Sequence, residues 1–163
     1  MTEFQRLFLV QSRSDFAVFK LLRKDQELPP CHALHYLQMA TELLGKAHAW
    51  RQGPRTRTHR AFVGFLRSLT SNRQAQVKLG FEGRNEHWGS MIRKSVPLAE
   101  RVETLAPALN PDGPNSEYPW PRATPQFAPV EHAFDVWREL QKPAGGTFLN
   151  LVGHLFAAAE AFL

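Results

Sequence analysis

Residues 35–47, His-Tyr-Leu-Gln-Met-Ala-Thr-Glu-Leu-Leu-Gly-Lys-Ala, have the periodicity of one helix and decide the fold class of this chain. Small and apolar residues recur on one side of the stretch, while Gln38, Glu42 and Lys46 follow one another at intervals of one turn. An acid four residues before a base is the favourable order for a helical ion pair, which stabilises an exposed face by about 0.2–0.5 kcal/mol. We therefore expect Glu42 and Lys46 to pair on a solvent-exposed face.

The same periodicity extends on both sides of this stretch. A first helix is predicted from Thr2 to about Asp25, because Thr2 and Gln5 have the spacing of a capping box. Its apolar stripe is Phe4, Leu7, Phe8, Val18, Leu21 and Leu22, with Gln11 and Asp15 as polar gaps. Pro29-Pro30 ends this segment and opens a second helix from about Cys31 to Trp50. Its core-facing stripe is Leu34, Leu37, Ala40, Leu44 and Ala47.

Downstream of Gln52-Gly53-Pro54, further helices are expected. Thr58 is a suitable N-cap for a helix with the apolar series Phe62, Phe65, Leu66 and Leu69. Ser71-Asn72 caps a short segment that stops at Gly80. A helix over 85–94 is followed by another that begins at Pro97. The last two predicted helices are 130–140 and a terminal one, introduced by Gly145-Gly146-Thr147, whose wide apolar stripe reaches Leu163.

Residues 107–129 interrupt the helical pattern with a Pro-rich connection. Its prolines alternate with Asn, Asp, Gly and Ser, which is typical of an extended segment. Tyr118 and Trp120 lie in its middle, and we expect both rings to anchor it on the helical body; a partner site is the alternative. Because no strand-like alternation appears, the sequence predicts an all-α fold. It is a single domain over 1–163, a bundle of five to seven helices with this ordered Pro-rich loop before the last two.

Composition sets limits on the class of protein. A chain of 163 residues with 43% hydrophobic residues suits one folded domain. No apolar run approaches the roughly 20 residues that span a bilayer, and the first residues lack the features of a secretory signal. Cys31 is alone, so no intramolecular disulfide is possible. These features predict a cytoplasmic protein that does not associate with membranes.

Charge is unevenly distributed along the chain. Residues 1–80 hold 13 Lys and Arg against 5 acids, whereas residues 81–163 hold 7 against 10. No acid lies between Glu42 and Glu82, an interval that contains Lys46, Arg51, Arg55, Arg57, Arg60, Arg67, Arg73 and Lys78. Such a block is typical either of a phosphate-binding surface or of a solvated face that meets the acidic half of a second subunit.

Candidate sites for chemistry are few. His32 and His35 are one turn apart and provide at most two metal ligands, so a third from His154 would be needed. Cys31 beside His32 does not favour a nucleophilic pair, because neighbouring residues on a helix point about 100° apart. We predict no metal and no cofactor. No Gly-rich phosphate loop, nucleophile elbow or paired Cys-x-x-Cys motif is present.

Residues 4–70 resemble the opening helices of HEPN-type domains, the nucleotide-binding helical family of higher eukaryotes and prokaryotes. The resemblance rests on Ser14-Asp15-Phe16, on a Pro-terminated loop, on the Gln38, Ala40, Glu42, Lys46 and Ala47 pattern, and on Thr58-His59 before an apolar helix. Two positions depart from the family pattern. Leu43 stands where Lys is common, and Arg60-Ala61 follows His59 where Asp-Leu is common.

The resemblance implies a helical bundle, frequently a homodimer, linked to RNA, nucleotides or toxin–antitoxin and defence systems. Ribonuclease members carry an Arg followed by a His after four to six residues, and no Arg of this chain has a His at that spacing. We therefore predict no catalytic residues and lean against an enzyme. The candidate nucleic-acid or anion-binding residues are Arg51, Arg55, Arg57, His59 and Arg60.

Three classes of function stay open. The first is a non-catalytic module whose basic surface meets RNA, nucleotides or an acidic protein partner. The second is a divergent metal-independent ribonuclease that uses Arg51, Arg55 and His59. The third is a self-associating structural or adaptor protein. We also expect a homodimer that shares the apolar face of the terminal helix or of the second helix.

Overall fold

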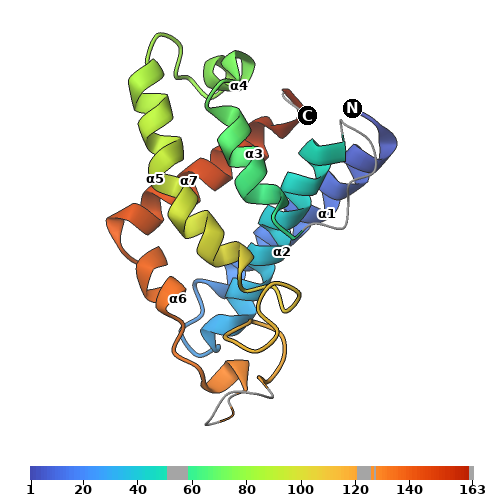
Figure 1. Cartoon of the computed structure of the whole chain (residues 1–163), viewed down its shortest axis with the longest axis vertical. Helices are drawn as coiled ribbons and strands as arrows, with labels where there is room; N and C mark the ends of the chain where they lie inside the picture. Colours follow the sequence, from blue (N-terminus) through green and yellow to red (C-terminus); the bar gives the residue numbers. More distant parts are fainter. Residues whose placement is uncertain (51–58, 121–125, 127, 162–163) are drawn as a thin grey trace.

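The computed structural model describes residues 1–50, 59–120, 126 and 128–161, and every regular element in these ranges is helical (Figure 1). The predicted all-α class is therefore confirmed for the described residues. The α-helices are α1 (Glu3–Leu22), α2 (Pro30–Ala49), α3 (Ala61–Leu69), α4 (Arg73–Lys78), α5 (Asn85–Glu103), α6 (Asp135–Leu140) and α7 (Pro143–Ala158). Two single 3-10 turns, η2 (Pro129–Glu131) and η3 (Ala159–Ala161), complete them.

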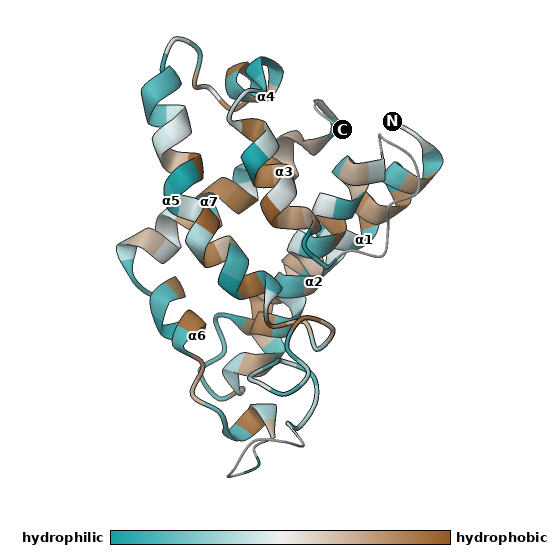
Figure 2. Ribbon diagram, viewed as in Figure 1, coloured by the Kyte–Doolittle hydropathy of each residue, from teal (hydrophilic) through white to brown (hydrophobic). Residues whose placement is uncertain are grey.

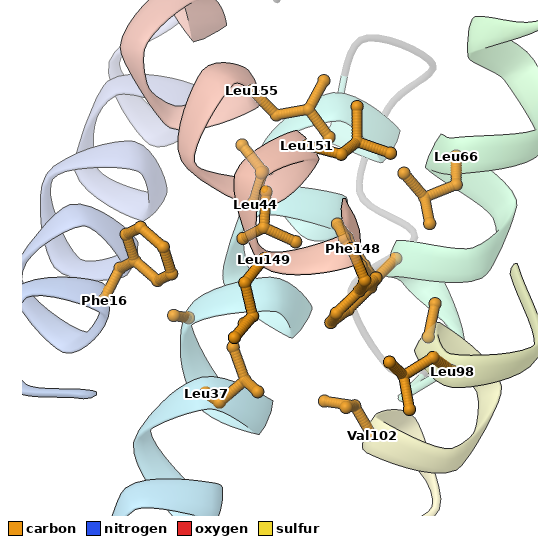
Figure 3. Packing of buried hydrophobic residues seen from close by; sticks show 14 of the residues in the cluster. Phe16, Leu37, Leu44, Leu66, Leu98, Val102, Phe148, Leu149, Leu151 and Leu155 are labelled. Atoms are coloured by element: carbon orange, nitrogen blue, oxygen red, sulfur yellow. The ribbon is translucent and has the colours of Figure 1, made fainter. Parts of the chain in front are cut away.

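Helix α2 lies at the centre of the molecule, between α1 on one side and α3 and α5 on the other (Figure 1). The predicted stripe from Leu34 to Ala47 is fully buried, which confirms the face assigned to this helix. Figure 3 shows Leu37 and Leu44 of α2 in one cluster with Phe148 and Leu149 of α7. Buried leucine and phenylalanine side chains each contribute about 1.5–3 kcal/mol by leaving water, so this cluster stabilises the bundle.

Helix α1 begins as predicted but buries a different face. The Thr2 hydroxyl accepts the Gln5 N–H at 3.3 Å, and the Gln5 side chain accepts the Thr2 N–H at 2.8 Å, which completes the capping box. The predicted apolar stripe is wrong, however, because Phe4, Leu7 and Leu21 are exposed by 56%, 48% and 68%. The residues that α1 buries are Gln5, Leu9, Ser12, Asp15, Phe16 and Phe19.

Two predicted helix boundaries are also wrong. The N-cap of α3 is Arg60, and Thr58 lies outside the described residues. Helix α5 runs through Pro97 instead of starting there. A proline inside a helix frees the carbonyl four residues earlier, here that of Arg93. Both Pro97 and Arg93 are solvent-exposed, so water can satisfy that carbonyl and the helix continues.

The end of the bundle depends on a close contact between α6 and α7. The predicted helix over 130–140 is shorter, since only Asp135–Leu140 is α-helical, and α7 starts at Pro143, before the glycines. A Cβ on Gly145 would lie 2.4 Å from the Glu139 carbonyl oxygen and 2.4 Å from the Leu140 Cα. Glycine therefore allows the first turn of α7 to fold back against α6.

Residues 104–120 form turns and bends, and of the two aromatic rings predicted to anchor this segment only one is buried against the bundle. Trp120 is buried and lies edge-on to His132 and Phe134, whereas Tyr118 is 61% exposed. The Asn115 side chain accepts the N–H groups of Glu117 and Tyr118, and it directs the backbone there. The expectation that both rings anchor the segment is thus wrong for Tyr118.

Candidate functional site

The candidate site forms where α2 crosses the start of α3. This crossing is close because Gly45 has no side chain: a Cβ there would lie 2.4 Å from the Ala61 carbonyl carbon and 2.5 Å from the Phe62 nitrogen. Glu42 and Lys46 lie on either side of Gly45 along α2. The crossing therefore brings the charged residues of α2 to His59 and Arg60, which lead into α3.

Glu42 is the central group of the site and is 4% exposed. Its Oε1 accepts a hydrogen bond from Lys46 Nζ at 2.5 Å, and its Oε2 accepts one from Gln38 Nε2 at 2.6 Å. His59 Nδ1 lies 3.0 Å from the same Oε2. The prediction of an exposed Glu42–Lys46 pair is therefore wrong: the pair exists, but it is buried beneath the start of α3.

The charge on Glu42 is held by its neighbours. Burial raises the pKa of this carboxyl, but hydrogen bonds from Lys46 and His59 and the charges of both outweigh burial, so its pKa lies below the ordinary value. A carboxylate on Nδ1 fixes the orientation of an imidazole. Because the His59 side chain is 38% exposed, its ring can reach a ligand in solvent.

A second buried carboxylate, Glu103 of α5, caps the N-terminus of α3. Its Oε1 accepts the Val63 N–H at 2.9 Å, and the Phe62 N–H contributes a second hydrogen bond. Burial raises the pKa of Glu103 above its ordinary value, although these N–H groups and the charge of Arg60 partly offset it. The N-terminus of α3 is thus already occupied by a carboxylate of the chain itself.

A hollow of about 420 Å³ lies beside this cap, between α3 and α5. Arg60, Gly64 and Arg67 line it from α3 and its start, and Glu100, Glu103 and Thr104 line it from α5. Arg67 pairs with Glu100 at 2.6 Å. Acids from α5 therefore face bases from α3 across this hollow, although the sequence between Glu42 and Glu82 contains no acid.

The structure brings together only part of the predicted anion-binding set. His59 and Arg60 lie at the start of α3, in the site described above. Arg51, Arg55 and Arg57 lie outside the described residues. The described residues on either side of them, Trp50 and His59, are each held by the bundle. Trp50 stacks on Phe4 with ring centroids 4.8 Å apart, and His59 is held by Glu42.

The histidines and the cysteine considered for metal or nucleophile chemistry do not come together in a site within the described residues. Within the described ranges, no three His, Cys, Asp or Glu side chains are placed to share a metal ion. His35 instead lies 3.5 Å from Glu117, and His154 is exposed on α7. Cys31 is buried, and burial raises the pKa of its thiol, which disfavours the thiolate that a nucleophile requires.

Sequence reasoning missed Gly45 and Glu103. The glycine is the one weak helix former in the 35–47 stretch, and a glycine inside a strong helix is a signal of close approach by another backbone. Glu103 gives no such signal, because the α3 N-terminus that it caps is 40 residues earlier in the chain.

Comparisons of this chain with protein-family models, with curated proteins and with solved structures found no match. Within the described residues, no helix combines the length and the apolar character that crossing a bilayer requires. The functional argument therefore rests on the residues of the site.

Proposed function

We propose that this chain is a non-catalytic helical module that binds a phosphate polymer, RNA in particular, through the segment Arg51–Arg60. Proteins bind nucleic-acid backbones by placing Lys and Arg against several phosphates and releasing counterions. Arg51, Arg55, Arg57 and Arg60 fall within ten residues that contain no acid. The function that we propose is therefore sequence-independent recognition of RNA or nucleotide phosphates.

The observation that carries this proposal is that Trp50 and His59, the described residues on either side of the arginines, are both held by contacts with the bundle. Trp50 is held by Phe4 at 4.8 Å and Phe8 at 5.7 Å, and His59 is held by Glu42. Residues between two held positions lose less conformational entropy on binding than a free tail of the same composition does. The held flanks and the run of arginines between them together support a phosphate-binding role.

Two bases outside the segment are paired with acids, Lys46 with Glu42 and Arg67 with Glu100. The proposal assigns phosphate contact to the run without acids, Arg51, Arg55, Arg57, His59 and Arg60, of which His59 also contacts Glu42. The resemblance of residues 4–70 to HEPN-type domains supports it, since members of that family are often linked to RNA or nucleotides.

The same resemblance leads us to propose a cytoplasmic homodimer in a defence or toxin–antitoxin context. The shared face must differ from the one expected, because the apolar stripe of α2, and Phe148, Leu151, Val152 and Leu155 of α7, are buried within the chain. Phe162 and Leu163 lie outside the described residues. Light scattering across micromolar concentrations tests this proposal, and a monomer throughout would end it.

The test of RNA binding uses fluorescently labelled poly(U) and two double variants that lose the same charge. Arg55→Ala/Arg57→Ala removes two proposed phosphate contacts, whereas Arg93→Ala/Lys94→Ala removes two exposed bases of α5. We expect the first to weaken binding and to lower the slope of log affinity against log salt by about 1.4, since each contact to a single strand contributes roughly 0.7. Equal weakening by both variants, or no binding by the wild type at low salt, would overturn the proposal.

A second candidate, metal-independent RNA cleavage, is favoured by the Glu42–His59 contact. A carboxylate on Nδ1 leaves Nε2 of a half-exposed imidazole available for proton transfer, as general acid–base catalysis requires. Arg51 and Arg55 would then neutralise phosphate charge. Cleavage of labelled RNA by the wild type, abolished by His59→Ala while poly(U) affinity persists, would favour this candidate; intact RNA after long incubation would exclude it.

A further inference from the structure

Exposed large hydrophobic side chains are concentrated in the first 28 residues, and two of them, Val10 and Leu21, lie on the outer face of α1. Of the nine large hydrophobic side chains that are exposed in the described part of the chain, six lie in residues 1–28. Val10, Ala17 and Leu21 follow at intervals of seven and four residues, with the small Ser14 between them, so they share one face of the helix. Figure 2 shows hydrophobic residues along α1, on the side of the bundle opposite α5.

The C-terminal end of this face is a basic hollow. A depression of about 770 Å³ is lined by Ala17 and Leu21, by Gln141 next to α6, and by the bases Lys20, Arg23 and Lys24. In the described ranges none of the three bases forms an ion pair with an acid. Lys20 lies 5.3 Å above the Phe16 ring. The nearby Asp25 carboxylate accepts the Glu27 N–H at 2.9 Å.

We propose that this surface is the docking site for an acidic amphipathic helix of a partner protein. The apolar residues of such a helix would lie along Val10, Ala17 and Leu21, and its Asp or Glu side chains would pair with Lys20, Arg23 and Lys24. An apolar stripe read at three- and four-residue spacing is the usual surface for a helix partner. Because the hollow is positively charged, the partner helix must carry negative charge there.

Charge argues against the α1 of a second copy of this chain as the occupant. In an antiparallel pair, the basic end of one α1 would meet the N-terminal end of the other. There Glu3 is already paired with Arg6 at 2.6 Å. In a parallel pair, three bases would face three bases. Neither arrangement supplies the negative charge that the hollow lacks.

The concave shape argues against a bilayer surface. A peripheral helix inserts protruding apolar side chains into the lipid interface. Here the bases and Leu21 surround a depression, and Gln141 lines it from another part of the fold. A bilayer surface would lie across the rim of this depression and would not fill it. A side chain that projects from a partner helix can enter the depression.

The experiment selects helical peptides from a phage-displayed library of about 20 residues, the length of α1. The bait is the full chain, and Lys20→Glu/Lys24→Glu serves for counter-selection. Both positions are exposed, so the variant should keep the melting temperature of the wild type. We expect enriched peptides with Leu or Ile at helical spacing, flanked by Asp or Glu.

The selected peptides are then compared on one single and two double variants by fluorescence anisotropy. We expect Leu21→Ser and Lys20→Glu/Lys24→Glu each to weaken binding at least about tenfold, or 1.4 kcal/mol, and Arg93→Ala/Lys94→Ala to have no effect. Peptides without acids, or peptides that bind the variants equally well, would overturn the proposal. So would sedimentation with phosphatidylserine vesicles that Leu21→Ser abolishes, or a dimer that Leu21→Ser dissociates. Because Arg51–Arg60 are intact in these variants, loss of peptide binding is distinguishable from loss of RNA binding.

Discussion

The α2–α3 crossing and the outer face of α1 distribute polar and apolar groups in opposite ways. At the crossing, Glu42 and Glu103 are each 4% exposed and hydrogen-bonded inside the bundle. On α1, Leu21 is 68% exposed beside Lys20 and Lys24, which form no ion pair with an acid in the described part of the chain. Charges are thus buried where three helices meet and apolar groups are exposed where one helix lies at the edge.

The contrast shows that the position of a helix in the bundle determines which of its faces is buried. Helix α2 has neighbours on several sides, so even its polar residues Gln38 and Glu42 are buried. Helix α1 packs mainly on α2, with Phe16 reaching Phe156 of α7, and the rest of its surface stays open. Four measurements test this contrast between the two regions.

The largest effect is expected from Glu42→Ala. Removing one partner of a buried ion pair costs about 3–5 kcal/mol, and we expect about 3, because the Lys46 and His59 side chains can turn to solvent. Urea unfolding measures this free energy. Arg67→Ala, which breaks the exposed pair with Glu100, serves as the control and should cost less than about 1 kcal/mol. Equal losses would mean that the crossing is not a buried site.

Next in size is the contrast between two leucines two residues apart on α1. Leu9 is 1% exposed and Leu7 is 48% exposed. Leu9→Ala should cost about 2–3 kcal/mol by opening a cavity at the edge of the bundle, whereas Leu7→Ala should stay within about 0.5 kcal/mol. Thermal unfolding of both variants checks the orientation of α1. A larger loss for Leu7→Ala would restore the stripe first expected from the sequence.

A pair of glycines tests the close crossing itself. A Cβ at Gly45 meets the backbone of Ala61 at 2.4 Å, whereas nothing lies within 4 Å of a Cβ at Gly64 on α3. Gly45→Ala should therefore cost about 1–3 kcal/mol through overpacking. Gly64→Ala should add about 0.5–1 kcal/mol, because alanine is the better helix former. Chemical denaturation measures the change in the free energy of unfolding for each variant. A change of the same sign in both variants would contradict the close crossing.

The smallest expected effect is the pH dependence of Glu103→Gln. The pKa of Glu103 is raised in the folded state, so protonated Glu103 contributes to the free energy of unfolding. That contribution is fully present below the pKa of Glu103 in the unfolded chain, about 4.5. It is lost as pH rises through the folded value. Glutamine stays neutral, so the variant should gain on the wild type as pH rises from about 4 to 7, by less than about 1.5 kcal/mol.

Glu100→Gln, one turn earlier on α5, is the matched control for this pH series. Its side chain is 48% exposed, and its carboxylate pairs with Arg67 at the surface. The stability difference between this variant and the wild type should not increase with pH. An increase as large as that of Glu103→Gln would show that burial of Glu103 is not the cause.

The sequence by itself determined the helical class, the core face of α2 and the capping box of α1. These features depend on residues close in the chain: the stripe from Leu34 to Ala47 repeats at helical spacing, and the capping box joins Thr2 to Gln5. Asn72, predicted to cap α4, accepts the Ala75 N–H at 2.9 Å for the same local reason. Of the candidate site, His59 and Arg60 could be nominated from charge alone.

Only the tertiary structure decided which groups are buried and which charges are paired. Periodicity places Phe4 and Leu21 on α1 but does not say which side faces α2. Glu103 reaches the start of α3 across 40 residues, and the contact depends on how α5 packs. Glu42 is buried because Gly45 lets α3 cross within 2.5 Å of where a Cβ would stand. Local pattern fixes helices, whereas burial depends on contacts between residues distant in sequence.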